Sequence, residues 1–167
     1  MTETRKYILS AAIALKKLQR MAYEIVEQNM DETGGLILAG VQENGVVLAN
    51  IIAGFLKDIF NGPIKVIEIT LNKRHPGEIG LSEEINFDDA VIILIDDVTN
   101  SGKTLLYALK PFIAFHPRKI QTLTLVERSH KMFPVTSDYV GISLASTLQE
   151  HIFVEVEGEE VKGAYLV

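Results

Sequence analysis

The chain has 167 residues, a length that suits a single domain, and we expect residues 1–167 to fold as one unit. Its 22 acidic and 16 basic side chains give a net charge of −6, which argues against broad, non-specific binding of nucleic acid. The absence of cysteine excludes disulfides and thiolate metal sites, and the lack of a signal peptide or a long apolar run predicts a cytoplasmic protein without membrane contact.

The first half of the chain alternates helical and strand patterns. Apolar residues at helical spacing predict an amphipathic helix from Ser10 to Asn29, with Ser10 as its N-cap. Next come a short apolar run, a second helical pattern and a longer strand pattern, over Gly35–Val41, Val46–Ile59 and Ile64–Leu71. The stretch 72–89 is polar and has no clear period, which predicts a long loop.

The second half begins with the most hydrophobic strand pattern, Val91–Ile95, which is followed at once by two aspartates. A helical pattern over Thr104–Phe115 follows, and Pro111 must kink or end that helix. The remaining strand patterns are Ile120–Val126, Tyr139–Leu144, His151–Val156 and Val161–Leu166.

This order predicts an α/β fold: a parallel twisted sheet flanked by helices, with a small C-terminal hood of short strands. Ligands of such sheets bind outside the carboxyl ends of the strands. The segments that follow a strand are Gly40–Gly45, Leu71–His75, Asp96–Thr104 and Glu127–His130, and we expect the chemistry there.

The segment Asp96–Thr104 carries the clearest chemical signal. It reads Asp-Asp-Val-Thr-Asn-Ser-Gly-Lys-Thr, between a buried strand and a helix. Its backbone N–H groups and hydroxyls, with the positive end of the helix dipole, can hold a phosphate dianion. Asp96 and Asp97 can accept hydrogen bonds from a vicinal diol. The segment therefore predicts a site for ribose 5-phosphate.

Two other interpretations of this segment are open. Gly102-Lys103-Thr104 matches the end of a nucleoside-triphosphatase P-loop, but that motif needs a glycine where this chain has Asp97, whose charge would repel the phosphates. A solvated turn with an N-capping residue is the other interpretation. It does not account for two adjacent aspartates directly after a buried strand.

At these residues the sequence resembles the type I phosphoribosyltransferases, whose fingerprint is an aliphatic strand, two acids and a loop that ends Thr/Ser-Gly-x-Thr. Within them it is most similar to the family of bifunctional pyrimidine-operon regulators and uracil phosphoribosyltransferases. Weaker similarities extend over nearly the whole chain, through Leu38–Val41, Ile69–Leu71, Leu125–His130 and Asp138–Gly141.

The resemblance implies transfer from phosphoribosyl diphosphate to a nucleobase, with uracil preferred, a nucleoside monophosphate as product, Mg²⁺ as cofactor and a homodimer as assembly. Residues 72–84 correspond to a flap that closes over the donor. The implied catalytic residues are Asp96 and Asp97, which bind the ribose diol. The other implied contacts are Thr99, Asn100, Ser101, Gly102, Lys103 and Thr104 to the phosphoribosyl group, Val41, Gln42, Lys73 and Arg74 to pyrophosphate, and Arg128 and Ile152, with the neighbourhood of His151–Phe153, to the base.

Two departures from the family pattern leave alternatives open. The pyrophosphate loop of the regulators carries basic residues, whereas this chain has Gln42-Glu43-Asn44, and Glu43 is unfavourable there unless it points to solvent or meets the metal. A nucleotide sensor with little catalysis is therefore a second hypothesis. Asn100 replaces the acid of purine-type relatives and cannot act as a general base. Binding of RNA through the helix that carries Lys16, Lys17 and Arg20 is a third hypothesis, against which the acidic composition counts.

Overall fold

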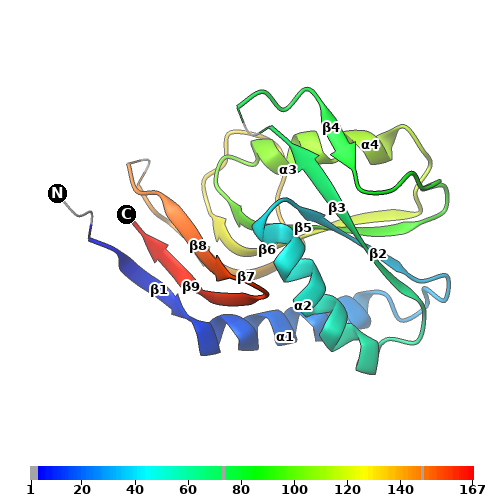
Figure 1. Ribbon diagram of the computed structural model, residues 1–167, viewed down its shortest axis with the longest axis horizontal. Helices are drawn as coiled ribbons and strands as arrows, with labels where there is room; N and C mark the ends of the chain where they lie inside the picture. The colour runs from blue at the N-terminus through cyan, green and yellow to red at the C-terminus, as the bar shows by residue number, and fades with distance from the viewer. Residues whose placement is uncertain (1–3, 73, 148) are drawn as a thin grey trace.

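The computed structural model describes residues 4–72, 74–147 and 149–167 of the chain. Among these residues a central sheet has six strands in the order β4-β3-β2-β5-β6-β7 (Figure 1). Every neighbouring pair in this sheet is parallel except β3 and β4. In chain order its strands are β2 (Leu36–Val41), β3 (Ile64–Leu71), β4 (Ile79–Leu81), β5 (Val91–Thr99), β6 (Lys119–Arg128) and β7 (Tyr139–Leu144). The expected α/β fold with a mostly parallel sheet is confirmed.

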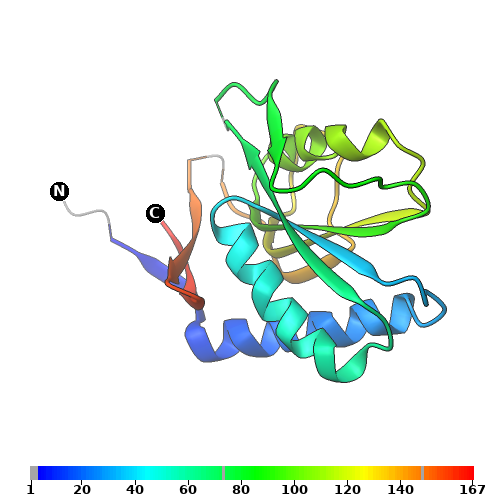
Figure 2. The ribbon, with the colours of Figure 1, turned by 45° about the vertical axis from the view of Figure 1, so that its right-hand side comes forward.

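Helices cover both faces of this sheet (Figure 2). One face is covered by α1 (Ala11–Gln28) and α2 (Asn44–Ile59), and the other by the short helices α3 (Lys103–Ala108) and α4 (Lys110–Ile113). The hydroxyl of Ser10 accepts a hydrogen bond from the Ile13 amide at 3.2 Å, so the predicted N-cap is confirmed. Pro111 lies in the first turn of α4, where the missing N–H is tolerated, and the helical pattern is divided before it. Within the described ranges no helix combines the length and the apolar character needed to span a bilayer.

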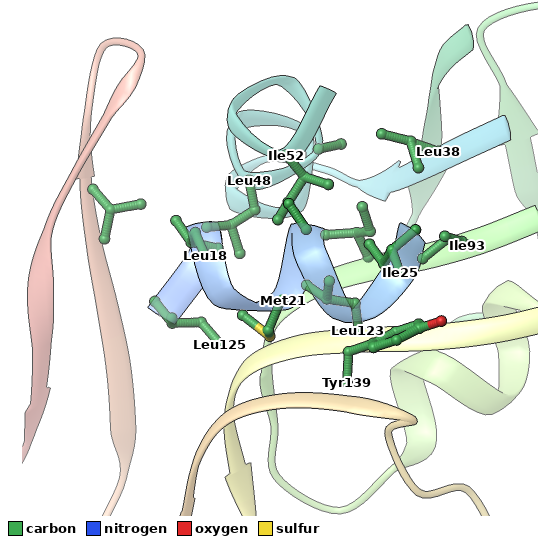
Figure 3. Close-up of a cluster of buried hydrophobic side chains, with 14 of the residues drawn as sticks. Leu18, Met21, Ile25, Leu38, Leu48, Ile52, Ile93, Leu123, Leu125 and Tyr139 are labelled. Carbon is green, nitrogen blue, oxygen red and sulfur yellow. The ribbon is translucent and has the colours of Figure 1, made fainter. Parts of the chain in front are cut away.

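Strand β5 is buried on both faces, which explains its run of aliphatic side chains. Ile93 and Ile95 pack in the cluster beneath α1 and α2, whereas Ile92 and Leu94 pack in the cluster beneath α3 and α4. Figure 3 shows the first cluster, whose labelled members are Leu18, Met21, Ile25, Leu38, Leu48, Ile52, Ile93, Leu123, Leu125 and Tyr139. Each fully buried aliphatic side chain of this kind contributes about 1.5–3 kcal/mol, so the two clusters hold β5 firmly in place.

A second sheet of three antiparallel strands, in the order β1-β9-β8, lies beside the central sheet (Figures 1 and 2). Its strands are β1 (Lys6–Ser10), β8 (Ile152–Glu157) and β9 (Glu160–Leu166). The last two form the expected C-terminal hood. The strand β1 was not expected, since its register with β9 runs from Lys6 opposite Leu166 to Ser10 opposite Gly163 and so depends on the far end of the chain.

Two further strands differ from the sequence-based expectation. The stretch 72–89 was expected to be a loop, but it contains β4, which pairs with the end of β3. Strand β5 continues beyond its predicted end to Thr99, because β6 continues beside it and places Asp96 opposite Thr124. Asp96 and Asp97 therefore lie within a strand, which fixes the direction of each side chain.

Candidate active site

A cavity of about 250 Å³ opens at the carboxyl end of β5, between the central sheet and the small sheet. The described residues that line it come from the start of α2, from β5 and the loop after it, from the start of α3, and from β8. Those that the sequence had singled out are Asp97, Thr99, Asn100, Ser101, Gly102, Lys103, Thr104 and Ile152; the others are Asn44, Val98, Leu105, Phe153 and Val154. The topology thus brings the predicted segments to one edge of the sheet.

The loop between β5 and α3, residues 100–102, is called the phosphate loop here after the ligand that the sequence predicts for it, and its geometry suits an anion. Gly102 has a φ of 86°, and a Cβ there would lie 3.2 Å from the carbonyl oxygen of Phe133. The Ser101 hydroxyl accepts a hydrogen bond from the Lys103 amide at 3.2 Å. Within the described part of the chain, the amides of Asn100, Ser101 and Gly102 donate no hydrogen bond to the protein. These amides are available to phosphate oxygens.

The two aspartates of β5 have different surroundings, because neighbouring residues of a strand face opposite sides. Asp96 is 2% exposed and accepts a hydrogen bond from the Asp97 amide at 2.9 Å. Asp97 lines the cavity, and its carboxylate accepts hydrogen bonds from the Val98 amide at 2.8 Å and from Asn44 Nδ2 at 2.9 Å. Asp97 is therefore the carboxylate that can reach a ligand, and Asp96 lies behind it.

The junction of β2 and α2 is packed closely against β5. A Cβ at Gly45 would lie 2.5 Å from the carbonyl oxygen of Ile95, and a Cβ at Gly40 would lie 2.7 Å from the carbonyl oxygen of Gly45. No side chain larger than hydrogen fits at either position without a shift of the backbone. Val41 is 1% exposed, so its side chain belongs to the core and only its backbone can serve the predicted pyrophosphate contact.

The two residues after Val41 are exposed, and the peptide bond between Gln42 and Glu43 is cis. The side-chain amide of Gln42 donates a hydrogen bond to the Glu68 carboxylate at 3.1 Å and accepts one from the Thr70 hydroxyl at 3.1 Å. Gln42 is thus held on strand β3. Glu43 is exposed, and its carboxylate adds negative charge at this edge of the sheet.

The segment after β3 borders a separate cavity of about 850 Å³, which it shares with Tyr107 of α3. Arg74 lies in its lining and is exposed. The Lys110 Nζ atom donates a hydrogen bond to the Gly77 carbonyl at 3.1 Å, which connects this segment to α4. Lys73, the other cation predicted for the flap, lies outside the described residues.

Arg128 lies behind the phosphate loop. It is 6% exposed, and its guanidinium donates to the carbonyl oxygens of Thr147 at 2.8 Å and Glu150 at 2.5 Å and to Asn100 Oδ1 at 3.3 Å. These contacts tie the loop before β8 to the phosphate loop. Arg128 borders a neighbouring cavity of about 220 Å³ and not the one that Ile152 lines.

Residues 5–161 of the chain match the family described as Phosphoribosyl transferase domain. The chain belongs to this family. Two of its curated relatives are both named Bifunctional protein PyrR. The one from Thermus aquaticus is 36% identical over 167 residues, which cover 93% of this chain and 90% of the relative. The one from Pelotomaculum thermopropionicum is 32% identical over 173 residues, which cover 96% and 95%. The resemblance to type I phosphoribosyltransferases and to the bifunctional regulators is confirmed.

Solved phosphoribosyltransferases share the fold. The hypoxanthine phosphoribosyltransferase of Trypanosoma cruzi, in a ternary substrates complex, matches with a TM-score of 0.78 over 95% of this chain and 94% of that chain at 14% identity. A hypoxanthine-guanine phosphoribosyltransferase of Bacillus anthracis matches with a TM-score of 0.71 over 85% and 84% at 19% identity. At such identities the likeness establishes the fold and leaves the base open.

Phosphoribosyltransferases generally use Mg²⁺ together with phosphoribosyl diphosphate. Among the described residues no group of three or more His, Asp or Glu side chains could hold a metal ion alone. Mg²⁺ commonly keeps several waters and binds through one or two carboxylates plus substrate phosphates. Asp97, at the cavity wall, fits that pattern, so the residues present suit a metal that arrives with the donor.

Five cavity residues of this phosphoribosyltransferase were not singled out individually as site residues: Asn44, Val98, Leu105, Phe153 and Val154. The place of Asn44 in the site was predictable from the sequence, because it follows β2 at the same edge of the sheet as the phosphate loop. Phe153 lies in the neighbourhood that the resemblance assigned to the base. Val154 had no signal, since the position of β8 opposite β5 is set by tertiary packing between distant segments.

Proposed function

We propose that the protein transfers a 5-phosphoribosyl group from phosphoribosyl diphosphate to a pyrimidine base, with uracil as the preferred acceptor. The observation that carries this proposal is the single cavity that joins unbonded loop amides, the Asp97 carboxylate and the apolar strand β8. The first two suit the phosphate and the ribose hydroxyls, and the strand suits the flat face of a base.

In this mechanism the bond from C1′ to the diphosphate breaks as the bond from C1′ to N1 of uracil forms, through an oxocarbenium-like state. The diphosphate leaves with the electron pair, and the N1 proton passes to solvent. The loop amides and the Thr104 hydroxyl hold the 5-phosphate, and Asp97 holds the ribose hydroxyls while its charge stabilises the cationic sugar. Mg²⁺, when bound with the donor, neutralises the diphosphate.

The resemblance to the family supplies the remaining proposed contacts. The Val41 backbone, Gln42 and the flap cations Lys73 and Arg74 would face the diphosphate. Ile152 would lie against the base, and Arg128 would hold the surrounding loop.

Uracil is favoured over purines by the residue at position 100. Asn100 is an amide whose Oδ1 atom accepts a hydrogen bond from Arg128 at 3.3 Å. It cannot take a proton from a purine nitrogen as a carboxylate could. The similarity of the chain to relatives named Bifunctional protein PyrR supports the same choice.

The direct test is release of pyrophosphate from phosphoribosyl diphosphate and Mg²⁺ with uracil, cytosine, hypoxanthine or guanine as acceptor. We expect turnover with uracil to exceed that with each other base. Asp97→Asn should reduce kcat/KM by about tenfold or more, because a hydrogen bond to a charged acceptor is worth about 1.5–3 kcal/mol. Faster turnover with hypoxanthine or guanine would contradict the assignment of the base.

A second function, a nucleotide sensor with little catalysis, is favoured by the loop between β2 and α2. This loop has no basic side chain, Glu43 is exposed on it, and Gln42 is bonded to Glu68, so a diphosphate would find carboxylates nearby. Calorimetric titration with uridine 5′-monophosphate separates the two functions. Saturable binding without pyrophosphate release from any base would select the sensor.

Binding of RNA has less support. On α1 Arg20 pairs with Glu24 and donates to the carbonyl oxygens of Val140 and Gly141 at 3.0 Å each, so its charge is partly occupied. A filter-binding titration at two salt concentrations would test this function, since phosphate contacts require a salt slope. Light scattering of the same sample would test the expected homodimer.

A further inference from the structure

The side chain of Asn44 joins three segments of the chain that meet at the cavity. Its Nδ2 atom donates one hydrogen bond to the Asp97 carboxylate at 2.9 Å and another to the carbonyl oxygen of Val154 at 3.0 Å. All three groups are partly buried and line the cavity. The first contact connects α2 to β5, and the second connects α2 to β8.

The place of Asn44 leaves its side chain little freedom. It is the first residue of α2, and the next residue, Gly45, packs against the carbonyl oxygen of Ile95 so closely that a Cβ would lie 2.5 Å away. The start of the helix therefore lies directly against β5, with no room for a side chain between them. An NH₂ group offers two hydrogens in one plane, which is what two acceptors on different strands require. A carboxylate of the same size offers none.

We propose that Asn44 is a positioning residue that orients the Asp97 carboxylate and fixes strand β8 at the base side of the cavity. This inference rests on the proposed function, because it assigns the ribose side to Asp97 and the base side to β8. Loss of the first bond would free the Asp97 side chain to rotate. Loss of the second would release the middle of β8, where Phe153 and Val154 line the cavity.

The isosteric substitution Asn44→Asp tests this role through pH. It places a second carboxylate about 2.9 Å from Asp97. Two carboxylates that close share one proton, and the pKa for loss of that shared proton, the second ionisation of the pair, is raised. Below that raised pKa the shared proton bridges the two carboxylates, as the Asn44 amide hydrogen does in the wild type. As the pH rises through this pKa, both carboxylates become charged and repel each other. Three other charged groups lie near this pair: Asp96 on β5, Lys103 on α3, and Glu43, which precedes residue 44 in the chain.

The experiment is calorimetric titration of uridine 5′-monophosphate from pH 5 to pH 8 for the wild type, Asn44→Asp, Asn44→Ala and the control Asn50→Asp. Asn50 is exposed on the same helix, so its variant carries the same charge change away from the cavity. The Kd of each variant is divided by that of the wild type at each pH, which removes the titration of the nucleotide itself.

For Asn44→Asp we expect a Kd ratio of about ten or more at pH 8, following the strength of hydrogen bonds to charged acceptors, and a smaller ratio at pH 5. Asn44→Ala should show a ratio that is raised and constant with pH, and Asn50→Asp should stay near one. A ratio for Asn44→Asp that does not change with pH overturns the proposal, and so does a ratio near one for Asn44→Ala.

Thermal unfolding without ligand keeps the proposal testable if the proposed function fails. A wild type that binds no nucleotide would refute the function alone. The melting temperature of Asn44→Asp, relative to the wild type, should still fall as pH rises from 5 to 8, because the raised pKa makes the stabilising proton leave over that range. If the melting temperatures of the wild type and of Asn44→Asp changed with pH by the same amount, the contact between residues 44 and 97 would be refuted.

Discussion

Single residues determine whether the phosphate loop can form. Gly102 combines a left-handed backbone, with φ of 86°, and a Cβ position 3.2 Å from the Phe133 carbonyl oxygen. Residues with a side chain rarely adopt such a backbone. Gly54, on the exposed side of α2, has no atom within 4 Å of its Cβ position. The two glycines therefore respond in opposite ways to the same substitution.

Gly102→Ala should lower the free energy of unfolding by about 1–3 kcal/mol, the cost of a strained residue of this kind. It should also weaken nucleotide binding, since the loop amides would shift. Gly54→Ala, the matched control, should raise stability by about 0.5–1 kcal/mol because alanine favours a helix interior. Urea unfolding of both variants measures this contrast. Equal effects would show that the loop does not need its left-handed residue.

At the scale of elements, α1 is held to the central sheet by a buried polar contact as well as by apolar packing. The Tyr139 hydroxyl of β7 donates to Gln121 Oε1 at 2.7 Å, and Asn29 at the end of α1 donates to that hydroxyl at 3.3 Å. Burial is the main cause that raises the pKa of Tyr139 to about 12. The neutral phenol is thus favoured in the folded state.

Tyr139→Phe should lower stability at neutral pH by about 1 kcal/mol through loss of these hydrogen bonds. Its effect must also depend on alkaline pH. The folded pKa is raised, so the stabilisation by Tyr139 is present below pH 10 and is lost as pH rises through about 12. Denaturant unfolding from pH 9 to 11.5 should show the wild type losing its advantage over the variant. A constant difference across that range would contradict this account of α1 docking.

Elements also show what the sequence could and could not predict. Five consecutive aliphatic residues from Val91 require cover on both faces, so a central strand was predictable, and with it the loop at its carboxyl end. Strand β1 was not predictable, because its partner β9 lies at the other end of the chain. The bond from Asn44 to Val154 spans 110 residues and depends on where β8 docks. The different surroundings of Asp96 and Asp97 could not be predicted either, because the sequence pattern ended the strand at Ile95 whereas β5 continues to Thr99.

At the scale of the whole molecule, ion pairs gather at the amino-terminal edge of the central sheet, opposite the candidate active site. Arg118, at the start of β6, binds the carboxylates of Asp89 at 2.7 Å and Glu32 at 2.9 Å. The Arg118 guanidinium lowers the pKa of Asp89, first through its hydrogen bonds and then through its charge. This network joins the loops before β2 and β5 and includes no residue that lines the candidate active site.

Asp89→Asn should slightly reduce stability at pH 7 and leave nucleotide binding unchanged. Asparagine tolerates the left-handed φ of 61° found at this position. Because the folded pKa of Asp89 is lowered, its stabilisation is present above about pH 4 and is lost as pH falls through the folded value. The melting temperatures of Asp89→Asn and of the wild type should therefore converge as the pH falls from 7 to 2.5. Asp58→Asn on α2 is the control, and an equal effect there would refute the pairing.

The central claim is that the loop after β5 and the Asp97 carboxylate hold the ribose 5-phosphate group of a nucleotide. A crystal structure with uridine 5′-monophosphate tests it most directly. We expect phosphate oxygens about 2.7–3.2 Å from the amide nitrogens of Asn100, Ser101 and Gly102, and ribose hydroxyls on Asp97. A nucleotide bound elsewhere, or one in this cavity with its phosphate away from these amides, would contradict the account.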